Sequence, residues 1–151
     1  MGDRTSAGDS VAYRLSGTHP KIRCGAVGGS PSGAEFRPRG KIVYDLPLAG
    51  YDTDTSTGEP IVPFDLQNYC TMDETVTFEV ENLDAIRLDL QERDEPSRTW
   101  KVFKWRDMAG LDRMLEASNA KYRGQGVFFA ETSGTVSVTV LANSGFFFRV
   151  K

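Results

Sequence analysis

The stretch Thr135–Val140, TVSVTV, alternates polar and apolar residues without a break, and it constrains the fold more than any other part of the chain. A period of two places its three valines on one face of a β-strand and its hydroxyl side chains on the other. The flanking segments Val127–Glu131 and Phe146–Val150 also resemble strands, and a glycine-containing turn separates each from the middle one. A meander of this kind buries its apolar face against a second sheet. The rest of the chain should therefore supply that sheet.

Three earlier segments show the same alternation. Lys41–Leu46 places every second residue (Ile42, Tyr44, Leu46) on one face, and Pro47 ends the strand. Thr75–Glu81 and Ala85–Leu90 alternate on either side of a polar turn, with Val76, Phe78, Val80, Ile86, Leu88 and Leu90 directed inward. These two segments predict a β-hairpin with one solvent-facing side.

The segment Thr99–Trp105 predicts a strand that carries bulky apolar residues on both faces. Trp100 and Val102 would share one face, and Phe103 and Trp105 the other.

One helix is expected, over Asp107–Asn119. Asp107 can cap its N-terminus, and Met108, Leu111 and Leu115 recur at helical spacing. Because this apolar stripe is narrow, the helix should lie on the surface of the sheets.

The sequence therefore predicts an all-β fold, an antiparallel β-sandwich or jelly roll of about seven or eight strands with one surface helix. Its 151 residues fit a single domain, which we place at residues 41–151. Residues 1–40 should form an extended N-terminal arm, because Gly25–Gly40 is rich in glycine, serine and proline. Within the arm, Val11–Leu15 can form a strand.

The charge and the hydropathy of the chain limit the classes of partner that we expect. The net charge is −3 and the chain has no large basic patch, so nucleic acid is not an expected partner. Its N-terminus resembles no secretion signal, and no apolar stretch has the length of a membrane span. Cys24 and Cys70 are the only cysteines, and either a disulfide or two free thiols fits them.

No catalytic signature is present, and no cofactor is implied. The single histidine, His19, stands next to Pro20 in the arm, where a solvated loop position is expected. A hydrolase remains the third hypothesis, with His19 and the pair Asp52 and Asp54 as the residues to replace.

The acidic loop Asp52–Glu59 is the candidate metal site. Asp52, Asp54 and Ser56 place oxygen ligands at alternate positions, as in the first half of a calcium-binding loop. The loop departs from that pattern because its glycine falls one position late and Pro63 stands where a glutamate is needed. The alternative is a surface loop in which Asp and Thr side chains bind their own backbone.

The chain has more aromatic side chains than one core face can bury. The helix and the arm could cover the second face, or these side chains could meet a partner. The candidate interface residues are Phe36, Trp100, Phe103, Trp105, Phe128 and Phe147.

The segment GAVGGSPSGAEFRPRG, followed by strands that end in GTVSVTVLANSGFFFRVK, resembles small bacteriophage virion proteins, in particular capsid decoration (cement) proteins. The resemblance covers the architecture of the whole chain. It implies a non-enzymatic structural protein that stabilises the capsid lattice through its arm and aromatic interface. It also implies the major capsid protein or other virion proteins as partners, a homodimer or homotrimer, and a place in the virion after synthesis in the host cytoplasm.

The alternative is a carbohydrate-binding β-sandwich, such as a tail-spike or lectin-like module. There Trp100, Trp105 or Tyr51 would stack on sugar rings, and the loop Asp52–Glu59 would hold calcium.

Overall fold

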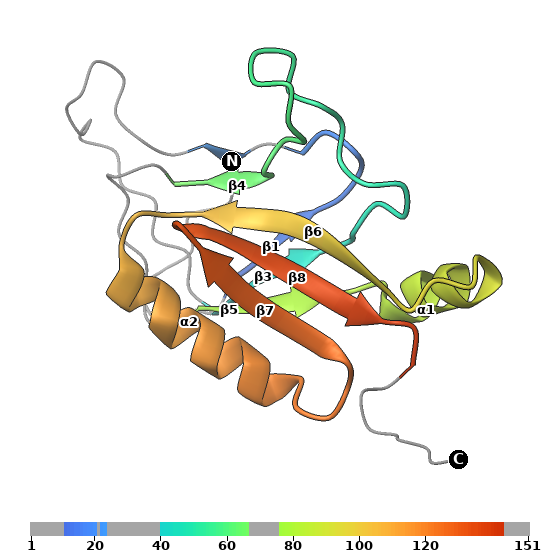
Figure 1. The fold of residues 1–151 in the computed structure, drawn as a ribbon. Coiled ribbons are helices and arrows are strands. Elements are labelled where there is room, and N and C mark those ends of the chain that lie inside the picture. The colour runs from blue at the N-terminus through green and yellow to red at the C-terminus, as the bar shows by residue number, and fades with distance from the viewer. Residues whose placement is uncertain (1–10, 21, 24–39, 67–75, 144–151) are drawn as a thin grey trace.

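A computed structural model describes residues 11–20, 22–23, 40–66 and 76–143 (Figure 1). Within these residues the elements follow one another as β1 (Val11–Leu15), β2 (Ile22–Arg23), β3 (Gly40–Tyr44), β4 (Phe64–Asp65), β5 (Thr77–Val80), α1 (Leu83–Glu92), β6 (Ser97–Lys104), α2 (Met108–Lys121), β7 (Val127–Thr132) and β8 (Thr135–Leu141). None of the described helices is long and apolar enough to cross a membrane.

The strands form two sheets. The three-stranded sheet has the order β1-β3-β5, and both of its pairings are parallel. The five-stranded sheet has the order β2-β4-β6-β8-β7, with parallel pairing up to β6 and antiparallel pairing beyond it. The predicted all-β antiparallel sandwich or jelly roll is therefore wrong: the fold is a mixed α/β arrangement in which parallel pairing is extensive.

The two sheets share one core. The Phe78 ring of β5 lies 5.1 Å from the Phe103 ring of β6 and 5.3 Å from the Phe129 ring of β7. The Tyr44 hydroxyl of β3 donates a hydrogen bond of 2.8 Å to the Val102 carbonyl of β6. Aromatic packing and this buried hydrogen bond therefore join the three-stranded sheet to the five-stranded one.

The strand β3 is the centre of the parallel sheet and is buried on both faces. Ile42 and Tyr44 are fully buried, as predicted, but so is Val43 between them. Parallel sheets bury both faces, and their strands carry continuous apolar runs. Residues 42–44 of β3 form such an apolar run.

The strand β5 confirms the predicted inward side chains Val76, Phe78 and Val80, all of which are buried. The hairpin partner predicted at Ala85–Leu90 is wrong, because these residues lie in α1. Ile86 and Leu90 are fully buried, whereas Leu88 between them is 58% exposed. A spacing of four residues returns to the same face of a helix, so burial follows the helical period rather than the alternation.

The strand β6 contains a β-bulge. Trp100 pairs with Val138 and Phe103 with Val136, so Val102 is an extra residue opposite β8. The bulge turns Trp100 and Phe103 toward the same core. The predicted division of β6 into two apolar faces is wrong for this reason, and Trp100, Val102, Phe103 and Trp105 are all buried.

The helix α2 was predicted, and the Asp107 carboxylate caps it by accepting a 3.1 Å hydrogen bond from the Gly110 amide. Its buried side is formed by Leu111, Met114 and Ser118, while Met108 is 45% exposed. In Figure 1 the helix runs beside β7 and β5, at one side of both sheets.

The hairpin β7–β8 confirms the strongest part of the sequence pattern. Val136, Val138 and Val140 are fully buried. Ser133 and Gly134 form its tight turn with positive φ angles of 52° and 83°. The third predicted strand of this meander, Phe146–Val150, lies outside the described residues.

Part of the segment assigned to the N-terminal arm belongs to the two sheets. The predicted strand Val11–Leu15 is present as β1 and pairs in parallel with β3, and β2 pairs with β4. Leu15 is buried, and its carbonyl accepts a 2.9 Å hydrogen bond from the Asp45 amide. Cys24 and Cys70 lie outside the described residues.

Candidate functional site

Three of the six predicted interface side chains belong to the core. Trp100, Phe103 and Trp105 are 4%, 0% and 6% exposed, respectively, so they offer almost no surface to a partner. The bulge at Val102 accounts for this burial, since it removes the second apolar face that the sequence pattern implied. Phe36 and Phe147 lie outside the described residues.

Phe128 is the predicted interface residue that is exposed, with 50% of its surface open to solvent. It pairs with Thr139 on the outer face of the five-stranded sheet, and Ala130 pairs there with Ser137. We name this surface the β6–β8–β7 outer face and define it by two cross-strand rows, which comprise Thr99, Lys101, Phe128, Ala130, Ser137 and Thr139. The next row on the same side of the sheet, Lys104, Thr135 and Thr132, borders it. Neither described helix crosses it (Figure 1).

The β6–β8–β7 outer face is chemically uniform. Apart from Phe128 and the single charge of Lys101, its side chains are small, and most carry a hydroxyl group. The Thr99 and Thr139 hydroxyls lie 2.8 Å apart and satisfy each other. The surface is therefore nearly uncharged, with one aromatic side chain standing out from it.

The acidic loop, proposed as a metal site, is a self-bonded turn. The Asp54 carboxylate accepts hydrogen bonds from the Ser56 amide at 2.9 Å and from its hydroxyl at 2.7 Å. The Asp54 amide donates a 2.7 Å hydrogen bond to the Glu59 carbonyl, and this bond closes the loop. The Thr57 hydroxyl accepts a further hydrogen bond of 3.2 Å from the Glu59 amide. This is the alternative that the sequence left open, in which Asp and Thr side chains bind their own backbone.

Asp52, the remaining candidate ligand, faces residues 18 and 19 instead. Its carboxylate accepts a 3.1 Å hydrogen bond from the Thr18 hydroxyl and lies 3.5 Å from Nδ1 of His19. Both side chains of the His19–Asp52 pair are more than half exposed. In the part of the chain that the structure describes, no three His, Cys, Asp or Glu side chains are arranged to hold a metal ion.

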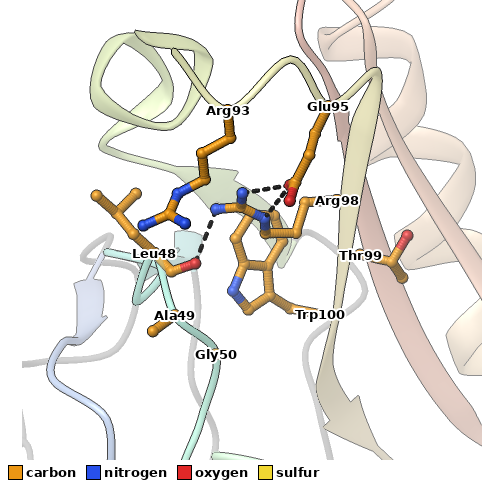
Figure 2. A pocket seen from close by; sticks show the side chains of 8 residues that line it. All are labelled: Leu48, Ala49, Gly50, Arg93, Glu95, Arg98, Thr99 and Trp100. Carbon is orange, nitrogen blue, oxygen red and sulfur yellow. Dashed lines mark hydrogen bonds and ion pairs between the residues drawn. The ribbon is translucent and has the colours of Figure 1, made fainter. Parts of the chain in front are cut away.

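A cavity of about 360 Å³ lies between the turn after β3, the end of α1 and the start of β6 (Figure 2). Its lining residues are Leu48, Ala49, Gly50, Arg93, Glu95, Arg98, Thr99 and Trp100. Figure 2 shows the Arg98 guanidinium in the middle of this cavity, bonded to Glu95 and to the Leu48 carbonyl.

Arg98 is fixed by partners on several sides. Its guanidinium donates a hydrogen bond of 2.8 Å to the Leu48 carbonyl and one of 2.9 Å to the Asp89 carboxylate. It also forms an ion pair with Glu95. Arg93 binds the same Asp89 carboxylate at 3.1 Å. The hydrogen bond from Arg98, together with that from Arg93, lowers the pKa of Asp89 below its usual value. Two cations and two carboxylates therefore balance one another around the cavity.

The side chains that line this cavity hold the two sheets together. Besides the bond from Arg98 to Leu48, the Trp100 indole N–H donates 2.8 Å to the Pro47 carbonyl. Both side chains come from β6 and hold the turn that follows β3, so they fasten one sheet to the other. The sequence pattern gave no sign of this role for Arg98, which follows a charged segment typical of a solvated turn.

Tyr51, a candidate for stacking on sugars, packs against the core and is half-buried. Among the described residues, its buried hydroxyl has no hydrogen-bond partner. Burial raises the pKa of Tyr51 far above its usual value, with a further contribution from Asp45. The ring is therefore held in the protein interior rather than presented as a stacking platform.

A second cavity, of about 400 Å³, lies where β6 ends, beside the β7–β8 turn and the start of α2. We name it the β6-end pocket; it is lined by Asp65, Lys104, Trp105, Arg106, Met108, Ser133 and Gly134. The Trp105 amide donates 2.9 Å to the Gly134 carbonyl, which fixes the turn against β6.

Comparison of the chain with models of protein families, with curated proteins and with solved structures finds no match.

Proposed function

We propose that this protein is a non-enzymatic structural binding protein of a viral particle, a decoration protein that reinforces a capsid lattice. The observation that carries the binding role is the half-exposed Phe128 on the β6–β8–β7 outer face. A surface with few charges and a protruding aromatic side chain has the composition typical of an interface core.

Two features support this choice of surface. The β6–β8–β7 outer face is built on antiparallel strands with an uninterrupted ladder between β7 and β8, so it is rigid before a partner arrives. The other predicted interface aromatics that the structure describes are buried, which leaves Phe128 as the aromatic anchor available to a partner. The link to a capsid comes from the resemblance in chain architecture.

The test is binding of the purified protein to capsids assembled without it. Phe128→Ser should weaken co-sedimentation about thirtyfold, since an aromatic anchor contributes roughly 2 kcal/mol or more at an interface. Leu88→Ser is the matched control, because Leu88 is 58% exposed but lies on α1, away from the outer face. Equal binding by the two variants would reject the outer face as the docking surface.

Truncation tests the role of the N-terminal arm, and it must stop before β1. Deleting residues 1–10 leaves β1 in place, whereas deleting residues 1–36 also removes β1 and β2, which pair with β3 and β4. If the arm reaches across the lattice, the shorter deletion should reduce capsid binding without a change in the unfolding transition. Unchanged binding by the shorter deletion would remove this role from residues 1–10.

The carbohydrate-binding alternative gains no support from the described residues. Trp100 and Trp105 are nearly buried, and an indole ring must be exposed on one face to stack on a sugar. A glycan array with and without a chelator remains its direct test.

A further inference from the structure

We propose that the β6-end pocket binds an oxyanion, a carboxylate or phosphate group carried by a small organic molecule. This site borders the β6–β8–β7 outer face at the end of β6, and it does not depend on the function proposed for that face. The inference starts from side-chain hydrogen-bond donors that line the pocket and have no partner among the described residues.

Two cations face the pocket from the end of β6. Lys104 and Arg106 are both exposed and both line the cavity. Neither side chain forms a hydrogen bond or an ion pair with any residue that the structure describes. The Ser133 hydroxyl, in the turn between β7 and β8, also lines the pocket and lacks a partner within the described ranges. An ammonium, a guanidinium and a hydroxyl group together offer donors suited to a bound oxyanion.

The contrast with the Arg98 cavity shows why these donors matter. There, Arg98 is held by Asp89, Glu95 and the Leu48 carbonyl, so its charge is already compensated. In the β6-end pocket two cations face a single lining carboxylate, Asp65, so one positive charge is left over among the lining side chains. The two cavities are similar in volume, at about 360 Å³ and 400 Å³, but only the second has cationic side chains without partners among the described residues.

Two carboxylates beside the residues of the pocket are engaged in hydrogen bonds with backbone amides. Asp107 accepts its hydrogen bond from the Gly110 amide, and Glu131 accepts one of 2.8 Å from the Gly134 amide. Asp65, the one carboxylate in the lining, is 6% exposed and lies opposite Lys104 in the pairing of β4 with β6. The lining side chains therefore carry two positive charges and one negative charge, which favours an anion.

The shape of the pocket indicates how the anion is attached. A cavity of about 400 Å³ is far larger than one oxyanion, so the anionic group belongs to a larger molecule. Met108, which is 45% exposed, supplies an apolar wall for the rest of that molecule. The ligand class is thus an organic carboxylate or phosphate ester with an apolar portion.

The experiment follows the backbone amide resonances of Ser133 and Gly134 while sodium phosphate or sodium acetate is added at constant ionic strength. We expect saturable shifts in at least one of the two titrations. Saturation with phosphate alone assigns a phosphate group, and saturation with acetate alone assigns a carboxylate. Shifts that stay linear in both titrations would overturn the proposal.

The variants Lys104→Met and Arg106→Met identify the donors. Each change should raise the apparent dissociation constant at least about tenfold, because a charge-assisted hydrogen bond contributes roughly 1.5 kcal/mol or more. Lys101→Met is the matched control, since Lys101 lies on the same strand but belongs to the β6–β8–β7 outer face. Equal affinity in all three variants and the unchanged protein would also overturn the proposal.

Discussion

The side-chain amide of Asn119 binds both backbone polar groups of Phe129. It accepts a 2.7 Å hydrogen bond from the Phe129 N–H and donates one of 2.8 Å to the Phe129 carbonyl. Asn119 lies on α2, and Phe129 lies on the edge strand β7. The same helix covers the edge of the other sheet, where the Phe78 amide donates to the Ser118 hydroxyl and the Val80 amide to the Tyr122 hydroxyl, each at 2.9 Å. One helix therefore satisfies unpaired edge groups of both sheets, which protects them from pairing with another chain.

Replacing Asn119 by alanine should leave the Phe129 N–H and carbonyl without partners. We expect a loss of about 1–3 kcal/mol in the free energy of unfolding, because partly buried polar groups lose their hydrogen bonds. Amide exchange at Phe129 should accelerate as well. Glu116→Ala on the exposed side of α2 is the control, and a similar loss in both variants would contradict the role of Asn119.

Removing each of the two buried tyrosine hydroxyls should change the stability of the protein differently. Tyr44→Phe deletes the hydrogen bond to the Val102 carbonyl and should cost about 1–3 kcal/mol. Tyr51→Phe deletes a buried hydroxyl that lacks a partner among the described residues, so stability should stay unchanged or rise by up to about 1 kcal/mol. Urea denaturation measures both. A destabilised Tyr51→Phe would show that this hydroxyl does have a partner.

The ion pairs of Glu79 should make stability depend on pH. Partial burial acts to raise the pKa of Glu79, but hydrogen bonds from Lys121 and Lys41 outweigh it and hold the pKa below the ordinary value of 4.5. A carboxyl whose pKa is lowered on folding stabilises the protein above the unfolded pKa, and this contribution is lost as the pH falls through the folded value.

The measurement compares the unfolding free energy of the unchanged protein with that of Glu79→Gln across pH. The difference should be constant near neutral pH and should shrink as the pH falls below about 4.5. Glu92→Gln, at an exposed position at the end of α1, is the control for removing a surface carboxylate. A Glu79→Gln difference that grows in acid would contradict the assigned sign.

Glycine is required at position 134 for two reasons. Its φ is +83°, and an added Cβ would lie 2.8 Å from the Trp105 carbonyl oxygen. Gly134→Ala should therefore cost more than Gly124→Ala, since Gly124 has a similar φ of +76° but open space around it. We expect about 1 kcal/mol for Gly124→Ala and an additional 1–3 kcal/mol, roughly, for Gly134→Ala. Thermal unfolding of the two variants checks this order.

Local patterns predicted the elements whose burial follows one clear period. The strand β8 was predicted because its valines alternate without interruption, and α2 because its cap and helical spacing agree. The helix α1 was missed because Ile86, Leu88 and Leu90 also alternate at the period of a strand. Nothing in that pattern shows that Leu88 is the residue left exposed.

The pairing of the strands could not be predicted from local sequence patterns. A parallel sheet brings together distant segments, and β3 shows it only as a short continuous apolar run. The bulge at Val102 depends on contacts with β8, so the sequence could not show that Trp100 and Phe103 share one core. The two cavities also combine residues from separate elements, and for this reason neither was predicted.

The strand β6 pairs in parallel with β4 on one side and antiparallel with β8 on the other. The antiparallel part of this sheet, β6, β8 and β7, lies within residues 97–141 together with α2, whereas the parallel strands β2 and β4 come from the first half of the chain. Contacts between residues close in sequence form sooner, because closing a short loop costs less entropy. We expect the second half of the chain to form the folding nucleus, onto which the parallel strands assemble afterwards.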